Sequence, residues 1–260
     1  MRARLTRLSP VLIAALAVGA AVVSFTPSFA RPGGTAPTAS GGPDRKLIER
    51  GQSLFAEGCS SCHGFDARGV PDQGPSLRRV GALAADFYLR TGRMPLSYPG
   101  EEPSRAEPRY SNRQIEAIVA YVASLGGPPV PRVDPRRGSL SDGQRLFTSS
   151  CAGCHSVTAV GGVATGASAP PLDRATATQV GEAVRIGPYL MPRFNRKLIG
   201  SRDVDSLARY IDYTQDPDDA GGWGIGHIGP VPEGMVAWLL AAAALLLIAR
   251  LIGERRKAGD

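Results

Sequence analysis

The five residues Cys59-Ser60-Ser61-Cys62-His63 recur in a second copy, Cys151-Ala152-Gly153-Cys154-His155. Each copy is a C-x-x-C-H motif, the pattern at which haem is attached covalently to a chain. Two thiols at this spacing can add to the two vinyl groups on one edge of a porphyrin, and the histidine that follows then ligates the iron. The sequence therefore predicts two covalently bound haems c. The predicted attachment residues are Cys59, Cys62, Cys151 and Cys154, and the predicted proximal iron ligands are His63 and His155.

Other uses of paired cysteines fit this pattern less well. A C-x-x-C pair alone is also typical of a dithiol redox site or of half a zinc site. In four-cysteine zinc sites the second pair usually follows the first after about 15–20 residues. Here a domain's length of sequence separates the two pairs, both are followed by histidine, and together they use all 4 cysteines of the chain. We therefore favour haem over zinc and over a dithiol.

Two methionines follow the motifs at similar distances, and each precedes a proline, in Met94-Pro95 and Met191-Pro192. The other two methionines are Met1, at the start, and Met235, at the beginning of an apolar run. A methionine in a core is usually a gap filler, but here both copies carry one. We predict that Met94 and Met191 are the distal iron ligands. Thioether ligation raises the haem potential and leaves no iron position for oxygen or peroxide.

Further similarities around the motifs indicate an internal duplication. Gly51-Gln52-Ser53-Leu54-Phe55 corresponds to Gly143-Gln144-Arg145-Leu146-Phe147, and Gly74-Pro75-Ser76-Leu77 resembles Ala169-Pro170-Pro171-Leu172. Each copy ends in a predicted amphipathic helix, the first over 111–125 with a capping box formed by Ser111 and Gln114. The pattern is all-α, with irregular loops expected at 64–86, 96–110 and 156–176.

Composition and periodicity together divide the chain into eight segments. They are a signal peptide or N-terminal anchor at 1–30, a linker at 31–43, a first haem domain at 44–126, a Pro-rich linker at 127–138, a second haem domain at 139–216, a Gly-rich juxtamembrane segment at 217–234, a transmembrane helix at 235–252 and a basic tail at 253–260.

The N-terminal segment combines a basic start, an apolar run over 11–23 and Ser28-Phe29-Ala30, which is typical of a cleaved export signal. A retained segment would instead be an anchor and would make the chain two-pass. The apolar run at 235–252 is about 27 Å long as a helix, enough to cross a bilayer. Because positive charge marks the cytoplasmic side, we expect the C-terminus in the cytoplasm and the haem domains outside the cell membrane.

The net charge of +7 comes mostly from basic residues at the two ends, and the central region is near neutral. It therefore indicates membrane topology and not nucleic-acid binding. His227 is the one histidine outside the motifs, and we interpret it as a polar loop residue in preference to an alternative haem ligand. Three tyrosines are candidates for contact with haem or its propionates, with packing on a helix face an equally good reading: Tyr110, Tyr121 and Tyr210.

With these residues in place, the chain resembles the dihaem cytochrome c subunit (cytochrome cc) of the actinobacterial menaquinol:cytochrome c reductase, the cytochrome bcc complex. The stretches that carry the resemblance are Gly92-Arg93-Met94-Pro95, Met191-Pro192-Arg193-Phe194 and the Gly-Pro-x-x-Glu-Gly at Gly229–Gly234. The resemblance covers nearly the whole chain. It implies two tandem class I cytochrome c domains followed by one C-terminal transmembrane helix.

The resemblance also implies partners and a direction of electron flow. In that family a cytochrome b subunit oxidises menaquinol, and a Rieske iron–sulfur subunit passes one electron to the first c domain. The second c domain then delivers it to the CuA site of an aa3-type cytochrome c oxidase within a supercomplex. The chain would thus be an electron carrier within a proton-motive oxidoreductase (a translocase) of the respiratory chain, with no catalytic residues of its own.

Other functions remain as alternatives from the residues alone. The chain is also compatible with a membrane-anchored dihaem subunit of another dehydrogenase or oxidase, although many of those carry the anchor at the N-terminus. A haem-based sensor or a dihaem peroxidase would need an open iron position, which ligation by Met94 and Met191 removes.

Overall fold

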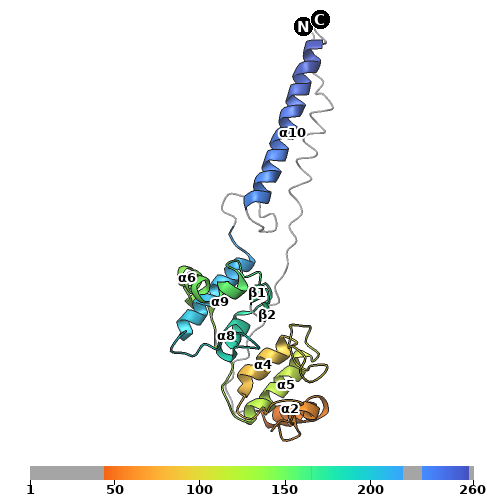
Figure 1. The fold of residues 1–260 in the computed structure, drawn as a ribbon, viewed down its shortest axis with the longest axis vertical. Helices are drawn as coiled ribbons and strands as arrows, with labels where there is room; N and C mark the ends of the chain where they lie inside the picture. The colour runs from red at the N-terminus through yellow and green to blue at the C-terminus, as the bar shows by residue number, and fades with distance from the viewer. Residues whose placement is uncertain (1–43, 165, 219–229, 258–260) are drawn as a thin grey trace, which may run out of the picture. The chain divides into compact units, whose positions relative to one another are not determined.

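The computed structural model of the protein describes residues 44–164, 166–218 and 230–257 (Figure 1). The predicted signal or anchor at 1–30, the linker at 31–43 and His227 lie outside the described residues. Among the described residues, helices dominate, as the sequence predicts. The elements in chain order are α2 (Arg45–Gly58), α3 (Ser60–His63), α4 (Gly81–Arg90), α5 (Asn112–Ser124), η1 (Pro135–Arg137), α6 (Leu140–Ser150), α7 (Ala152–His155), β1 (Gly162–Ala164), β2 (Ala167–Ala169), α8 (Ala177–Ile186), α9 (Ser201–Gln215) and α10 (Pro230–Lys257).

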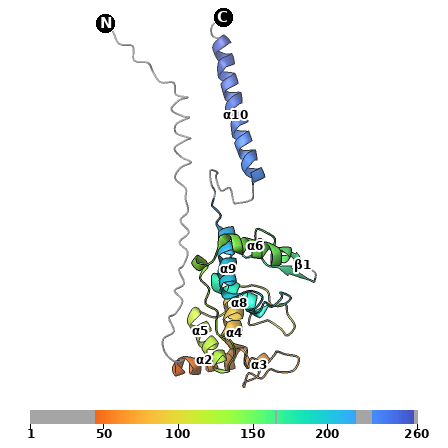
Figure 2. The ribbon, with the colours of Figure 1, turned by 90° about the vertical axis from the view of Figure 1, so that its left-hand side faces the viewer.

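The first helical domain is built from α2, α4 and α5, with α5 packed against both of the others (Figure 2). The predicted capping box at the start of α5 is confirmed, since the side chains of Ser111 and Gln114 satisfy its first free amides. The apolar positions of α5 face the core, where Ile115 and Ile118 are buried against Phe55 of α2. Burial of this helical stripe, at roughly 1.5–3 kcal/mol for each large apolar side chain, stabilises the domain.

The second helical domain repeats the arrangement with α6, α8 and α9. Its core contains Phe147 of α6 together with Leu207 and Ile211 of α9. The ring centroids of Phe147 and Tyr210 are 5.3 Å apart at an interplanar angle of 51°. The equivalent pair in the first domain, Phe55 and Tyr121, has a separation of 5.1 Å and the same angle of 51°. The duplication seen in the sequence is therefore also a duplication of core geometry.

A glycine sets the closeness of the first and last helices in each domain. A Cβ atom on Gly51 would collide with the backbone carbonyl oxygen of Ala117, and one on Gly143 would collide with that of Ser206. Glycine lowers helix propensity by about 1 kcal/mol relative to alanine. This cost is offset because the two backbones can approach each other so closely.

Three local expectations from the sequence are wrong. The loop expected at 64–86 ends earlier, because α4 already begins at Gly81, after the positive φ of 66° at Arg79 and 78° at Gly81. The region 156–176 is not wholly irregular, since β1 and β2 form an antiparallel hairpin in which Gly162 pairs with Ala169. The Gly-rich segment 217–234 is helical from Pro230 onward, because proline is well tolerated in a first helical turn, where its missing N–H has no partner to lose.

The C-terminal helix α10 has the properties of a membrane span by length and composition. Its apolar part, Gly234–Glu254, is 21 residues long with a mean hydropathy of 2.4, and none of its most apolar window is buried within the protein. A core helix of a soluble protein would instead be covered by other elements. An exposed apolar surface of this extent requires a nonaqueous environment or a partner.

Replacement of Gly51 or Gly143 by alanine is expected to destabilise the altered domain by about 1–3 kcal/mol, because the added Cβ forces the two helices apart. The measurement is urea-induced unfolding of the haem-loaded chain in detergent, followed by circular dichroism. Gly253→Ala, in α10, is the matched control, since nothing lies within 4 Å of its added Cβ and it belongs to neither domain. Unchanged stability of both core variants would contradict the close-crossing argument.

Candidate functional site

The first C-x-x-C-H motif lies directly at the end of α2. The amide of Cys59 donates to the carbonyl of Phe55 at 2.9 Å, which ends α2, and the short helix α3 then carries Cys62 and His63. One helical turn therefore presents both thiols and the imidazole together. Because Phe55 is held in the core, the motif is anchored to the crossing of α2 and α5.

The second motif is placed in the same way. The amide of Cys151 donates to the carbonyl of Phe147 at 2.8 Å, and α7 carries Cys154 and His155. None of the four cysteines is in a disulfide. The two pairs stand in different domains, and among the described ranges no group of three or more His, Cys, Asp or Glu side chains is arranged to hold a metal ion. This arrangement does not provide a joint four-thiolate zinc site.

Each motif histidine is oriented by a backbone carbonyl. The Nδ1 of His63 donates to the carbonyl oxygen of Pro75 at 2.7 Å, and that of His155 donates to Pro170 at 3.0 Å. A carbonyl can only accept, so Nδ1 carries the proton and Nε2 is left as the ligand atom. Burial also lowers the pKa of His155, although its bond to Pro170 opposes this shift. Burial thus favours the neutral imidazole that an iron requires, and the bond to Pro170 fixes which nitrogen is free to bind it.

The first thiol of each motif lies in an apolar environment. Burial, and to a smaller extent the neighbouring Cys62, raises the pKa of Cys59 to about 11. Burial and Cys154 raise the pKa of Cys151 to about 11 as well. The thiols are therefore protonated at neutral pH and unlike the low-pKa thiolates of dithiol redox enzymes. This environment suits a cysteine that becomes a buried thioether.

The predicted distal ligands lie beside the same cores as the motifs. Met94 and Cys59 both pack against the cluster that contains Phe55. Met191 and Cys151 both pack against the cluster that contains Phe147. The structure thus brings the methionine and the first cysteine of each motif into one apolar region.

Arg93 provides a direct test of whether these residues fit a haem. Its guanidinium carbon lies 5.1 Å from the ring centroid of Phe87, and its Nη1 atom is buried with no hydrogen-bond partner in the described structure. Burial, and then the charge of Arg105, lowers its pKa. An unpaired buried donor on a cation requires an anion. A haem propionate beside Met94 would supply one, so the residues present fit the cofactor.

The three candidate tyrosines have different surroundings. Tyr121 and Tyr210 pack on Phe55 and Phe147, and the hydroxyl of Tyr210 donates to the carbonyl of Val157 at 2.8 Å. Helix-face packing therefore accounts for these two. Tyr110 packs against the first core cluster, and its hydroxyl lies next to Gly58 at the end of α2. Burial is the main cause of the raised pKa of Tyr110, with a further contribution from Cys59.

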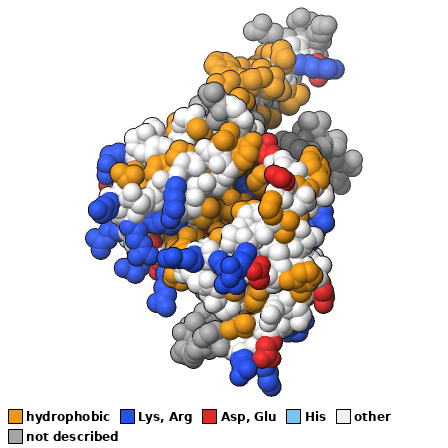
Figure 3. Space-filling model, turned by 60° about the horizontal axis from the view of Figure 1, so that its bottom comes forward, with side chains coloured by type: hydrophobic (Ala, Val, Ile, Leu, Met, Phe, Trp, Pro, Cys, Tyr) orange, Lys and Arg blue, Asp and Glu red, His pale blue; other side chains and the backbone are white. Residues whose placement is uncertain are grey.

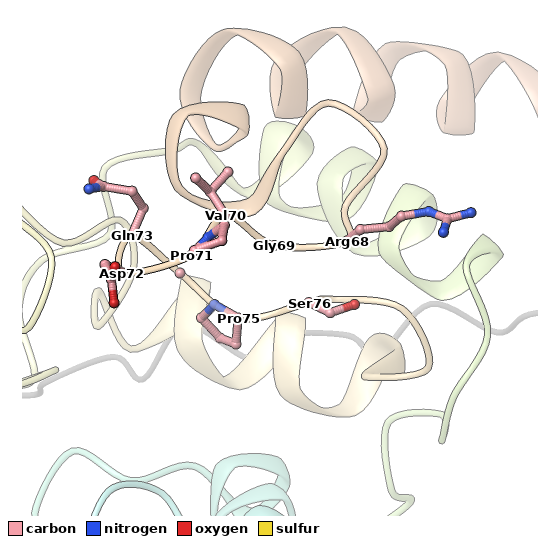
Figure 4. A pocket seen from close by; sticks show the side chains of 9 residues that line it. Arg68, Gly69, Val70, Pro71, Asp72, Gln73, Pro75 and Ser76 are labelled. Carbon is pink, nitrogen blue, oxygen red and sulfur yellow. The ribbon is translucent and has the colours of Figure 1, made fainter.

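The loop that holds His63 also forms a pocket of about 550 Å³ (Figure 4). Its walls come from one continuous stretch, residues 68–76, which includes Pro75. In Figure 4 the side chains of Arg68 and Gln73 point away from each other at opposite ends of the loop. The pocket is open and lined by a single loop, so it is a feature of the histidine-supporting loop and does not by itself define where a haem lies.

The second site has a basic segment close to its methionine. Residues 185–202 contain no acidic side chain, and four of the basic ones are exposed, namely Arg193, Arg196, Lys197 and Arg202. The hairpin region 156–172 carries no charge, and Val163 is 90% exposed. Lys and Arg side chains also gather along one side of the face in Figure 3. The edge of this site therefore combines apolar and positively charged surface.

Comparisons with known proteins agree with the two-domain arrangement. A family model described as cytochrome c matches residues 48–126, and one described as cytochrome c oxidase, cbb3-type, subunit III matches residues 138–211. The chain is 35% identical over 231 residues to the cytochrome bc1 complex cytochrome c subunit of Corynebacterium diphtheriae, covering 82% of each. It is 36% identical over 219 residues to the subunit of the same description from Mycobacterium tuberculosis, covering 80% of this chain and 78% of the relative.

A more limited similarity involves another class of subunit. The chain is 39% identical over 97 residues to the cbb3-type cytochrome c oxidase subunit CcoP of Rhodobacter capsulatus, covering 34% of this chain and 33% of that protein. The described structure has two helical domains of cytochrome c type and one apolar C-terminal helix. Covalent haem c is the cofactor that such domains imply.

Two features of the sites escaped the sequence reasoning. The first is the pair of carbonyl groups, of Pro75 and Pro170, that orient the two histidines. The signal for it in the sequence was the resemblance between the stretches 74–77 and 169–172, which follow the two histidines. Arg93 was visible next to Met94, but nothing in the sequence distinguishes a buried arginine from a solvated one. Its role depends on Phe87, which reaches it from the preceding helix.

Substitution of Arg93 by glutamine is expected to leave haem attached, because the cysteines and histidine are unaffected, but to lower the potential of one haem by roughly 50 mV. Loss of a nearby cation favours the ferric state. For a one-electron couple, about 59 mV corresponds to a tenfold change in the equilibrium constant. The measurement is a spectroscopic redox titration. Arg113→Gln, at an exposed position of α5, is the control, and identical potentials in both variants would contradict the assignment of Arg93 to a propionate.

Proposed function

Because the chain belongs to the family of cytochrome c subunits of the cytochrome bc1 complex, we propose that it is the dihaem electron-transfer subunit of a menaquinol:cytochrome c reductase (bcc) complex. The observation that carries this proposal is the pair of equivalent sites, each with two cysteines, a carbonyl-oriented histidine and a methionine against one core.

The residues of each site have separate roles in this proposal. Thioether bonds from Cys59 and Cys62 hold the first haem, and those from Cys151 and Cys154 hold the second. A bound haem supplies the Fe(III)/Fe(II) couple that carries one electron. The chain's own residues orient and shield that couple. The proposed iron ligands are His63 and Met94 in the first domain and His155 and Met191 in the second.

The two axial side chains also limit the chemistry. The bond to Pro75 or Pro170 fixes the imidazole ring, so that the ligand atom does not reorient between oxidation states. A bound haem with Met94 or Met191 as its second ligand would have no iron position open to oxygen or peroxide, and the thioether would favour the reduced state. A fixed ligand set of this kind suits an electron carrier in preference to a sensor or a peroxidase.

We further infer that the first domain accepts electrons from a Rieske subunit and that the second delivers them to the CuA site of an aa3-type oxidase. The basic and apolar edge beside Met191 supports delivery from the second domain, because an acidic partner would be attracted and aligned by it. The cytochrome b subunit would hold the chain at the membrane. In this topology α10 is the anchor, the haem domains lie outside, and the basic residues after Gly253 lie in the cytoplasm.

Substitution of Met191 by alanine is expected to leave both haems attached while lowering the potential of the second and slowing delivery to the oxidase at least tenfold. The reason is that the thioether stabilises Fe(II), and its loss opens a coordination position. The measurement combines the optical spectrum, carbon monoxide binding and a redox titration. Met235→Ala, in α10, is the matched control, and a wild-type spectrum and potential for Met191→Ala would exclude the ligand assignment.

The function itself is tested by isolating the complete chain, tagged at the C-terminus, from its native membrane in mild detergent. We expect a cytochrome b, a Rieske protein and an aa3-type oxidase to co-purify, with menaquinol-analogue oxidation coupled to oxygen uptake without added cytochrome c. Isolation with a cbb3-type oxidase instead would favour the alternative that the similarity of residues 138–211 suggests. Isolation with a dehydrogenase would also reject the proposed complex.

A further inference from the structure

A pair of acidic side chains is buried where the two helical domains meet. Helix α4 of the first domain packs against α8 of the second within one compact unit, Pro43–Asp260. Asp86 of α4 is 7% exposed and Glu182 of α8 is 0% exposed. Carboxyl groups are rarely buried unless a partner satisfies them. This pair belongs neither to a C-x-x-C-H motif nor to a methionine loop, so the proposed haem sites do not account for it.

The two acids occupy equivalent places in the duplicated domains. Asp86 is the sixth residue of Gly81–Arg90, and Glu182 is the sixth residue of Ala177–Ile186. When equivalent helices of a duplicated domain pack on each other, equivalent side chains face one another, as they do in a two-fold interface. Duplication of an acidic position therefore produces an acid opposite an acid, which is destabilising unless the charge is reduced.

Only one side of this pair has a cationic partner. The Nε of Arg90 donates to Oδ1 of Asp86 at 2.8 Å, and Nη1 of Arg90 donates to the side-chain oxygen of Asn112 at 3.2 Å. Asp86 is therefore held as a carboxylate. Both carboxyl oxygens of Glu182 are buried without a hydrogen-bond donor from the described residues.

The protonation of Glu182 follows from these contacts. Two carboxylates have no proton to share, so the contact between Glu182 and Asp86 becomes a hydrogen bond only when one of them is protonated. Burial, followed by the negative charge and the hydrogen bond of Asp86, raises the pKa of Glu182 to about 9, whereas Arg90 acts in the opposite direction. Glu182 therefore carries the proton at neutral pH and donates a hydrogen bond to the carboxylate of Asp86.

The other charged groups near α8 are already engaged elsewhere. On α9, which packs on α8, the carboxylate of Asp205 accepts from the amide of Asp134, and that of Asp203 accepts from the amide of Gly200. Arg185 of α8 donates to the carbonyls of Phe194 and Gly200. The charged groups that act on Glu182 are thus the two from α4, Asp86 and Arg90.

We propose that Asp86 and Glu182 share one proton across the contact of α4 and α8, and that this proton holds the two haem domains at a fixed separation. The pair acts as positioning residues for electron transfer between the domains. This role rests on the proposed function, whereas the proton-dependent contact itself does not. A second contact lies nearby, where Nη2 of Arg105 donates to the carbonyl of Arg174 at 2.9 Å and to Oε1 of Gln179 at 3.2 Å. Those bonds are insensitive to pH near neutrality, so the proton is the variable part of the interface.

The direction of the pH effect follows from linkage. In a separated state Glu182 is solvated and ionises at its ordinary pKa near 4.5, whereas in the packed state it remains protonated up to about pH 9. The packed state thus binds one more proton between these values. Raising the pH through that window disfavours packing, by about tenfold in the ratio of separated to packed molecules for each pH unit. Packing is strongest below this window, and the dependence ends above it.

The test measures the distance between the domains in the complete, haem-loaded chain in detergent. Ser53→Cys and Ser149→Cys, at exposed positions of α2 and α6, carry gadolinium spin labels that tolerate reduction of the haems. Pulsed electron paramagnetic resonance is recorded between pH 6 and pH 10. We expect one narrow distance at pH 6 and a longer, broader population that grows about tenfold per pH unit toward pH 9. A distribution that does not change with pH would overturn the proposal.

Variants separate the shared proton from packing in general. Glu182→Gln keeps a donor toward Asp86 and cannot ionise, so its narrow distance should persist to pH 10. The exposed Glu116→Gln on α5 should retain the native pH profile. Retention of the native profile by Glu182→Gln would refute the shared proton. If Glu182→Gln fails to take up haem, Asp86→Asn replaces it and should lower the pH at which the dependence ends, because burial still raises the pKa of Glu182 but the charge of Asp86 no longer adds to it. An upper limit unchanged in Asp86→Asn would refute the proposal equally.

Because the measurement uses neither an electron donor nor an acceptor, its result is independent of the respiratory assignment. A pH-dependent distance in a chain that co-purifies with another oxidase would support the proton-dependent contact and reject only the proposed partners. A pH-independent distance in a chain that supports carrier-free menaquinol oxidation would reject the proton-dependent contact and leave the proposed partners standing.

Discussion

The close crossing of the first and last helices in each domain is the contact on which the rest of the structure depends. It is possible because Gly51 and Gly143 have no side chain at the point where a carbonyl of the other helix passes. The crossing buries Phe55 and Phe147, and the next turn of each helix ends at the first cysteine of its motif. The position of the covalent attachment point thus follows from a backbone contact about two helical turns earlier.

The parts of the structure that were predicted correctly depend on short sequence separations. The two helical domains and the capping box at Ser111 follow from patterns of a few residues each, so spacing alone identifies them. The beginning of α4 was missed because a loop with left-handed residues such as Arg79 can end at many points. The buried acids were missed for a different reason. Nothing near Asp86 in the sequence indicates that Glu182, almost a hundred residues later, lies against it.

The two domains have kept one geometry while their surroundings have diverged. The loops that bring a proline carbonyl to each histidine differ in length, and the longer one contains the β1–β2 hairpin. The residue before the methionine is a partly buried, stacked arginine in the first domain, whereas Leu190 in the second is 56% exposed. The shared features are the two cysteines, the carbonyl-oriented histidine and the methionine of each site, and the differences lie in the residues and loops around them.

The acid pair at the domain contact cannot be explained by stability alone. A buried ionic group usually contributes no more than a well-packed apolar side chain of the same volume, because desolvation offsets the attraction. Apolar residues in place of Asp86 and Glu182 would join the domains at least as firmly, but at every pH. An acid pair gives a contact whose strength depends on one proton, and it also favours one register, in which Glu182 lies against the Asp86–Arg90 group. Distance-dependent electron transfer between two haems would benefit from both properties.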